Sequence, residues 1–204
     1  MDTHTDETAE RGPRPRDSRA TKKLLLGAAT VEFAEFGLSG ARIDRIAERA
    51  GANKRLLYVY FGDKEKLFEA VLRTEIGRLV EQVPLVDGDL VSFAGTRFDY
   101  MLAHPETARL AAWRRFEHSH FSGAETDSYR ERIEAVAAAQ RAGRLDDSLP
   151  AVDLFAMVLR LTESWLDAPP ALRATCDAEP MSEERLREHR DSLLEAVRRI
   201  TDPR

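Results

Sequence analysis

The sequence of 204 residues holds a single cysteine, Cys176. One thiol cannot form an internal disulfide, and it excludes the zinc sites that are built from several cysteines. No run of about 18 apolar residues is present, so no segment is expected to span a membrane. The first ten residues are polar and acidic and lack the apolar core of a secretory signal peptide. We therefore expect a soluble, cytoplasmic protein.

The common signatures of catalytic sites are missing as well. The sequence has no Gly-x-Ser-x-Gly, no P-loop, no Gly-x-Gly-x-x-Gly and no His-Glu-x-x-His. His118 and His120 lie next to Glu117, but residues two apart point to different faces of a helix, which argues against a metal site. We expect no metal and no cofactor, and an all-helical enzyme is the least favoured alternative.

The charge is unevenly distributed along the chain. The net charge is −5, yet residues 11–66 carry 13 Lys and Arg against 7 Asp and Glu, whereas residues 67–204 carry 18 against 25. All five lysines fall within residues 22–66. A basic N-terminal third followed by an acidic remainder is typical of a protein in which one part meets a polyanion such as DNA.

The apolar residues recur with the period of an α-helix, and no alternating β-branched run is present. The pattern predicts an all-α protein of about nine helices, with residues 1–16 as a disordered arm and 168–180 as a loop. A run of basic residues in and next to this arm either is solvated or touches DNA phosphates; it consists of Arg11, Arg14, Arg16 and Arg19. The expected helices are 18–36, 42–50, 53–60, 63–83, 90–103, 105–118, 125–142, 150–167 and 182–201.

Residues 41–67 predict a helix-turn-helix. Gly51 suits the left-handed turn between the two helices, and Asn53 suits the cap of the second. In that second helix Leu57 and Phe61 are expected to pack inward, while the polar side chains between them point outward. A helix presented in this way fits the major groove of B-DNA.

The same residues resemble the DNA-binding signature of the TetR family of bacterial transcriptional repressors. The match runs without a gap from Ile46-Ala47 and Ala50-Gly51, through Leu57-Tyr58-Val59-Tyr60-Phe61, to Asp63-Lys64-Glu65 and Leu67. The resemblance implies a three-helix DNA-binding domain at 17–64. It also implies a larger helical domain at 65–204 that binds a small molecule and forms a homodimer.

The resemblance implies a set of DNA contacts. Tyr60 and Lys64 match positions that contact phosphates, and Lys54, Arg55 and Tyr58 match positions that face the bases. An arginine that bonds guanine O6 and N7 is the commonest specific pairing. The alternatives are a solvated Lys54 and Arg55, and a Tyr58 that belongs half to the core.

The sequence departs from the family at two places in this region. Arg42 stands where the family often has Thr or Ser, and it is counted among the expected DNA contacts. Arg55 and Leu56 stand where the family often has Gly-Thr. Because Arg55 adds a long donor, the base preference of relatives does not transfer to this chain.

The expected ligand site centres on Trp113 and Glu117, which are four residues apart and share one helix face. Phe98, Met101 and Phe116 are expected to complete it. An aromatic wall with one carboxylate suits an organic cation. The alternative is a core tryptophan and a surface glutamate that pairs with a neighbouring arginine.

The last two expected helices, 150–167 and 182–201, are predicted to pair with their symmetry mates as a four-helix bundle. The expected interface residues of the amphipathic last helix are Leu186, Leu193, Val197 and Ile200. A charge at Leu193 or Val197 is then expected to give a folded monomer. The sequence thus predicts a dimeric repressor that binds a palindromic operator and is released by a small hydrophobic molecule. A DNA-binding regulator without an effector is the main alternative.

Overall fold

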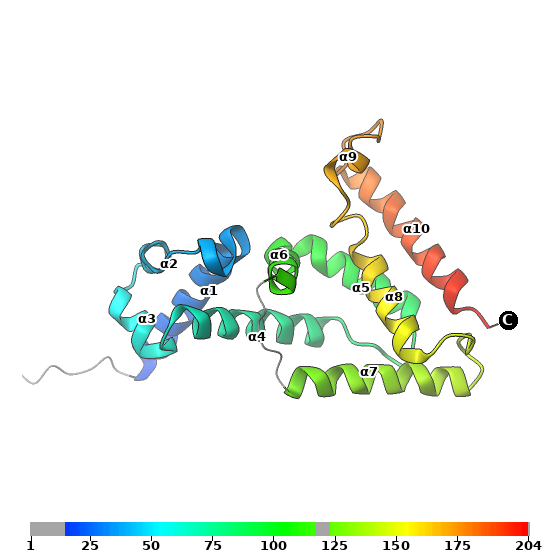
Figure 1. Cartoon of the computed structure of the whole chain (residues 1–204), viewed down its shortest axis with the longest axis horizontal. Helices are drawn as coiled ribbons and strands as arrows, with labels where there is room; N and C mark the ends of the chain where they lie inside the picture. Colours follow the sequence, from blue (N-terminus) through cyan, green and yellow to red (C-terminus); the bar gives the residue numbers. More distant parts are fainter. Residues whose placement is uncertain (1–14, 117–122, 204) are drawn as a thin grey trace, which may run out of the picture. The chain divides into compact units, whose positions relative to one another are not determined.

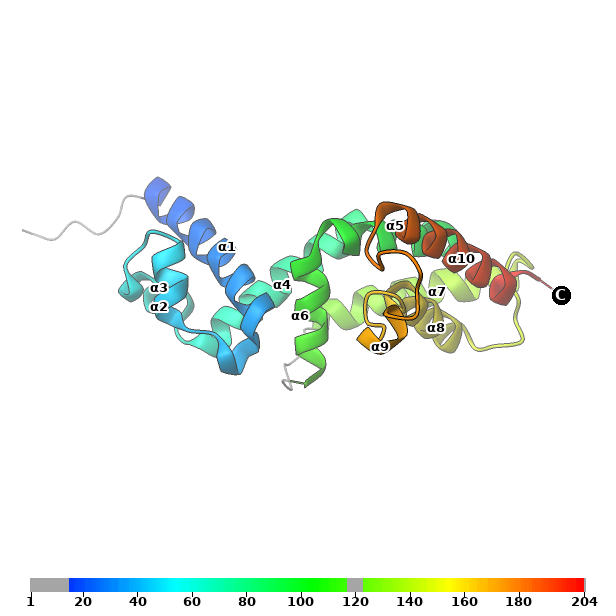
Figure 2. The same cartoon turned by 90° about the horizontal axis from the view of Figure 1, so that it is seen from above.

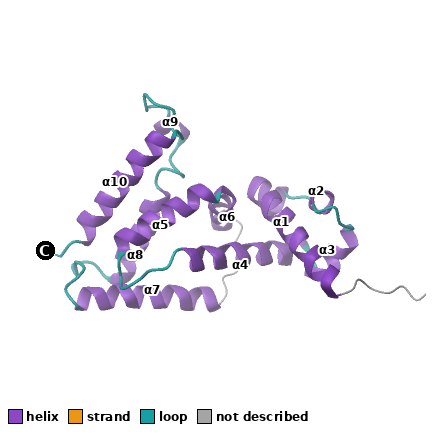
Figure 3. Cartoon of the chain, turned by 180° about the vertical axis from the view of Figure 1, so that it is seen from behind, coloured by secondary structure: helices purple, strands orange, loops and turns teal. Residues whose placement is uncertain are grey.

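A computed structural model describes residues 15–116 and 123–203 of the chain. In this part every regular element is a helix and no strand is present, which confirms the all-α prediction (Figure 3). No helix of the described residues combines the length and the apolar character needed to cross a membrane. The helices are α1 (Pro15–Gly40), α2 (Ile43–Arg49), α3 (Lys54–Phe61), α4 (Lys64–Gln82), α5 (Leu90–Ala103), α6 (Pro105–Phe116), α7 (Gly123–Arg141), α8 (Ala151–Glu163), α9 (Pro170–Arg173) and α10 (Glu183–Thr201).

The helix ends follow from local chemistry. Gly37 interrupts α1 with φ 65° and ψ −177°, a backbone conformation open essentially to glycine alone. The side chains of Asn53 and Asp89 accept the bonds that begin α3 and α5. The expected arm of residues 1–16 lies almost wholly outside the described residues, and α1 begins at Pro15.

One expected loop is partly helical. Residues 168–180 contain the four-residue helix α9, which begins at Pro170. Proline suits the first helical position because its φ is already fixed and its missing N–H is not needed there. The turn is too short to show a helical period, and for this reason the sequence predicts nine helices where ten are found.

The described chain forms two compact units. The first unit contains residues 15–74 and 109–116, and the second contains 75–108 and 123–203. In the first unit α1 packs against α2 and α3, and α2 packs against α3 (Figure 1). Its core includes Phe33 and Phe68, whose ring centroids lie 5.0 Å apart in an edge-to-face arrangement.

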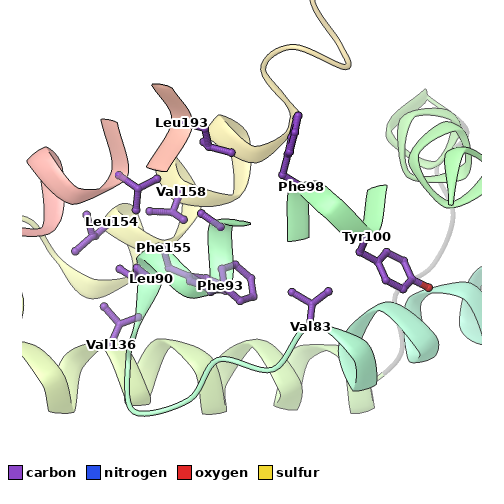
Figure 4. Close-up of a cluster of buried hydrophobic side chains, with 12 residues drawn as sticks. Val83, Leu90, Phe93, Phe98, Tyr100, Val136, Leu154, Phe155, Val158 and Leu193 are labelled. Carbon is purple, nitrogen blue, oxygen red and sulfur yellow. The ribbon is translucent and has the colours of Figure 1, made fainter. Parts of the chain in front are cut away.

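The second unit is built around α5. This helix packs against α10 and α8, and α8 also packs against α7 (Figure 2). Gly95 of α5 faces α10, where a Cβ would lie 2.9 Å from Nη2 of Arg190 and 3.2 Å from Cδ2 of Leu194. Figure 4 shows the buried side chains that these helices contribute: Val83, Leu90, Phe93, Phe98, Tyr100, Val136, Leu154, Phe155, Val158 and Leu193.

An aromatic cluster in the second unit makes its stability depend on pH. The His189 ring lies 5.4 Å from Trp165 and 5.6 Å from Phe98, and the Arg185 guanidinium stacks 4.2 Å from Trp165. Burial lowers the pKa of His189, and the charge of Arg185 lowers it further. The folded state therefore favours the neutral ring.

We expect this histidine to lower stability in acid. Above pH ~6.5 the ring is neutral in both states, and below it the unfolded chain takes up a proton before the folded one does. The melting temperature of the wild type should therefore fall more between pH 7.5 and 5.5 than that of His189→Gln. His104→Gln is the matched control, since His104 is the other described histidine. Equal slopes in wild type and His189→Gln would contradict the prediction.

Candidate DNA-binding surface and ligand cavity

The helix-turn-helix is formed as the sequence predicts. Helix α2 ends at Arg49, Gly51 turns the chain with φ 59°, and α3 begins at Lys54. Leu57 of α3 is fully buried, whereas Lys54, Arg55 and Tyr58 are exposed. The side chains expected to face the bases therefore share the solvent side of α3.

Lys54 is held by a partner that sequence reasoning missed. Its ammonium lies 2.6 Å from the carboxylate of Asp44 in α2, and both side chains are exposed. The hydrogen bond and the charge of Asp44 raise the pKa of Lys54. Position 44 carries no local signal for this pair, because the contact joins two helices across the turn. Lys54 is thus fully charged, and a base that it bonded would compete with Asp44 for its three ammonium protons.

Arg42 and Arg55 are both exposed, each at the start of a helix. The N–H of Arg55 donates to Asn53 Oδ1 at 2.8 Å, so the backbone is fixed while the guanidinium remains on the surface. Arg42 precedes α2, and its N–H donates to Glu32 Oε1 of α1 at 2.8 Å. Sequence reasoning missed Glu32 as well. Its signal is a charged residue beside Ala29 and Phe33, within the apolar stripe of α1.

The expected phosphate contacts are less open than the base-facing set. Lys64 is half-buried, and its Nζ donates to the carbonyl of Ala41 at 3.2 Å. Tyr60 is also half-buried, and its hydroxyl is enclosed without a hydrogen-bond partner among the described residues. A phosphate would have to meet the remaining ammonium protons of Lys64, and the Tyr60 hydroxyl would have to turn outward.

The expected ligand residues are divided between the two units. Phe98 and Met101 are buried in the second unit. Trp113 belongs to the first unit, where its Nε1–H donates to the carbonyl of Ala34 at 3.2 Å, and Phe116 is 74% exposed. Glu117 lies outside the described residues, as do His118 and His120. Among the side chains that the structure describes, no group of three or more His, Cys, Asp or Glu residues could hold a metal ion.

A different cavity lies within the second unit. Its volume is about 50 Å³, and it is lined by residues of α4, α5, α7 and α8 and by Val83. Its aromatic wall is centred on Phe155, whose ring centroid lies 5.5 Å from that of Phe93 and 6.4 Å from that of Tyr129. A mainly apolar hollow with a few polar groups is the usual form of a small-molecule site.

Charged side chains of both signs line this cavity. Arg97 is 9% exposed and is paired at 2.5 Å with Glu163 of α8. Arg132 bonds the carbonyls of Val80 and Val83 at 3.3 and 3.5 Å, and burial lowers its pKa. Glu125 of α7 supplies the carboxylate of the wall. A ligand of either charge would therefore meet an opposite charge here.

The residues expected at the dimer interface pack within the protomer itself. Leu193 and Val197 are buried with 3% and 0% exposure in the core of the second unit, and Leu186 and Ile200 pack against that core. We therefore revise the expectation that a charge at Leu193 or Val197 leaves the monomer folded. Apolar side chains that remain exposed on α8 include Val152 at 50% and Met157 at 47%.

Comparison with known proteins defines the class. Residues 25–71 match the model of the bacterial regulatory proteins of the tetR family, and residues 89–199 match that of the tetracyclin repressor-like C-terminal domain. The chain belongs to the TetR family of transcriptional repressors, which confirms the resemblance read from the sequence. The proteins that it matches are transcriptional regulators and not enzymes.

Individual relatives cover nearly the whole chain. The transcriptional repressor SCO4008 of Streptomyces coelicolor is 35% identical over 191 residues, which are 92% of this chain and 98% of the relative. The solved structure of the transcriptional regulator SCO4942 from the same organism is 32% identical, with a TM-score of 0.79 over 90% of this chain and 99% of that one. The regulator FadR of Bacillus subtilis, solved with stearoyl-CoA, shares the fold at 16% identity, with a TM-score of 0.59 over 86% of this chain and 97% of that one.

Proposed function

We propose that the protein is a homodimeric repressor that binds a palindromic operator and releases it when a small hydrophobic molecule enters the second unit. The observation that carries the DNA-binding part is the solvent face of α3, where Lys54, Arg55 and Tyr58 project from a helix-turn-helix. A dimer would place two such helices in successive major grooves, so a two-fold symmetric operator is expected. In this proposal the first unit reads DNA, and the second binds the effector and dimerises.

We expect the two kinds of DNA contact to separate on mutation. Arg55→Ala should reduce the preference for the operator over other sequences by about 1–3 kcal/mol, because a bidentate arginine discriminates between bases. Lys64→Ala should weaken all sequences alike and reduce the salt dependence by about one phosphate contact. Fluorescence anisotropy with a labelled duplex of the intergenic DNA beside the protein's own gene measures both.

The control is Arg199→Ala in α10, which removes one positive charge from a side chain that is 76% exposed in the second unit. It should leave affinity and salt dependence unchanged. A wild-type protein that protects no symmetric site on the flanking intergenic DNA in a footprinting experiment would refute the repressor proposal.

For the effector we propose an organic cation in the cavity of the second unit. Its rings would stack on Tyr129 and Phe155, and its charge would meet Glu125. The charge of Arg97 is already neutralised by Glu163, so it opposes a cation less than an unpaired arginine would. The stearoyl-CoA bound to FadR supports the view that this fold accommodates a ligand with a long apolar part.

Two dyes of similar shape and opposite charge test this assignment. Rhodamine 6G is a planar cation and fluorescein a planar anion, and the cation should bind more tightly and release the labelled operator duplex. Glu125→Gln should weaken the cation at least several-fold, since it removes the opposing charge, whereas Arg132→Gln should not. If fluorescein bound more tightly than rhodamine 6G, and Arg132→Gln abolished that binding, the effector would be an anion. The cavity would still be its binding site.

The alternative of a regulator without an effector makes a different prediction. In that case no small molecule would release the operator, and a variant that fills the cavity, such as Ser128→Trp, would behave like the wild type. The lining of the cavity favours a regulator that responds to an effector, because an apolar hollow with a few polar groups is the usual form of a small-molecule site.

A further inference from the structure

The first turn of α2 begins without the side chain that usually caps a helix. Arg42 occupies the N-cap position with φ −122° and ψ 124°, and it makes no side-chain cap bond. Arginine has five N–H donors and no acceptor, so it cannot take up the free N–H groups of the first turn. Arg45 stands three residues later, where a Glu or Gln would complete a capping box, and it has no acceptor either.

The missing acceptor comes from another helix. Glu32 of α1 is fully buried, and its Oε1 accepts from the N–H of Arg42 at 2.8 Å. The same oxygen accepts from Nε of Arg45 at 2.7 Å, and Nη2 of Arg45 lies 2.6 Å away. One carboxylate oxygen thus joins the N-cap backbone to the side chain of the third helical residue. This is the connection that a capping box makes locally.

Further contacts fix the partner of this carboxylate. Arg45 also donates to the carbonyl of Gly40 at 3.1 Å, and its guanidinium stacks 4.1 Å from the ring of Phe36. A buried carboxylate is costly unless donors surround it, and a negative charge at a helix N-terminus is favourable. The second oxygen of Glu32 is buried without a partner among the described residues.

We propose that Glu32 is the positioning residue of the helix-turn-helix: it caps α2 from α1, so that the side chain at the N-cap position is free to contact DNA. The second half of this statement rests on the proposed function, to which it adds that Arg42, one of the expected DNA contacts, meets a phosphate. A helix that is capped locally would have Ser or Thr at position 42. This chain has a cation there, and Glu32 supplies the capping acceptor instead. Helix α2 in turn holds α3, by direct packing and through the pair of Asp44 and Lys54.

The test combines two substitutions at Glu32 and one at Glu35, each in the full-length protein. Glu32→Gln keeps an acceptor for Arg42, and its amide nitrogen takes the place of the unpartnered Oε2. Glu32→Leu removes the acceptor. Glu35→Gln is the matched control, because it makes the same change at an exposed position of the same helix. Circular dichroism verifies the fold, and anisotropy with the labelled intergenic duplex gives affinity and salt dependence.

Glu32→Leu should weaken DNA binding about tenfold and lower the salt dependence by about one phosphate contact, as Arg42→Ala should. The double variant Glu32→Leu with Arg42→Ala should bind DNA no more weakly than the more impaired of the two single variants, because both substitutions remove the same phosphate contact. Glu32→Gln should stay within about threefold of the wild type. A residue that only stabilises the fold would leave the salt dependence of the folded variant unchanged, and that result would overturn the proposal, as would additive effects.

A second measurement needs no variant that folds poorly. In wild-type protein, hydrogen exchange followed by NMR should show the Arg42 amide protected, and its protection should persist in Glu32→Gln. An Arg42 amide that exchanges as fast as an unstructured one would overturn the proposal even if Glu32→Leu does not fold. A wild type that binds no DNA would instead refute the proposed function and leave the cap to be judged by exchange alone.

Discussion

Val197→Asp is expected to unfold the second unit and not to release a folded monomer. Val197 is completely buried in the hydrophobic core that side chains of α5, α8 and α10 form in the second unit. An unpaired charge in such a place costs several kcal/mol, on the order of the whole stability of a domain, which is about 5–15 kcal/mol. Circular dichroism and urea unfolding should show the loss of helix and of the cooperative transition.

The matched change on an exposed residue separates core from interface. Met157→Glu introduces the same charge on α8 at a side chain that is 47% exposed, so it should change the stability of the protomer by only about 0.5 kcal/mol. If this face of α8 meets its symmetry mate, the variant should sediment as a folded monomer at micromolar concentration and bind the operator weakly. A folded, monomeric Val197→Asp would show that α10 belongs to the interface as the sequence pattern predicts.

Glu163→Leu is expected to lower the free energy of unfolding by about 3–5 kcal/mol, because it leaves the buried Arg97 without its charged partner. The guanidinium of Arg97 is 9% exposed and is bonded to Glu163 at 2.5 Å and to Thr162 at 3.0 Å. Leucine fills the space of the glutamate side chain but leaves that positive charge with a single neutral partner. Urea denaturation of wild type and variant measures the difference in the free energy of unfolding.

Two controls identify the cause of that loss. The double variant Arg97→Met with Glu163→Leu replaces both charges by apolar groups, and it should recover most of the stability. Arg160→Ala removes the exposed partner of Glu163 and should cost at most about 1 kcal/mol. A double variant as unstable as Glu163→Leu alone would mean that the shape of the glutamate, and not its charge, is what the site requires.

Features that depend on neighbours in the chain were predicted well. Gly37, Gly51 and Asn53 act through their own backbone or their own side chain, so their effects can be read at the position where they stand. The burial of Leu57 follows from the helical period alone. These local rules define the helix-turn-helix and the solvent face of α3.

Features that join distant segments were not predictable in this way. An i, i+4 spacing places Trp113 and Glu117 on one face, but it does not say what that face meets. The cavity arises where residues of α4, α5, α7 and α8 converge, from Ile76 to Leu159, and no local pattern marks it. The amphipathic pattern of α10 likewise shows that Val197 is covered, but not whether its own protomer or a second one covers it.

The pair of Lys54 and Asp44 bears on how the protein searches a genome. In the proposed complex a duplex competes with this carboxylate for the lysine, and the cost of weakening the ion pair is the same whatever the sequence. Only a site that offers an acceptor in the right place compensates for it. We therefore expect weaker binding to random DNA and a shorter residence time at each non-specific site. The protein should then arrive faster at its operator, where a base replaces Asp44 as the partner of Lys54.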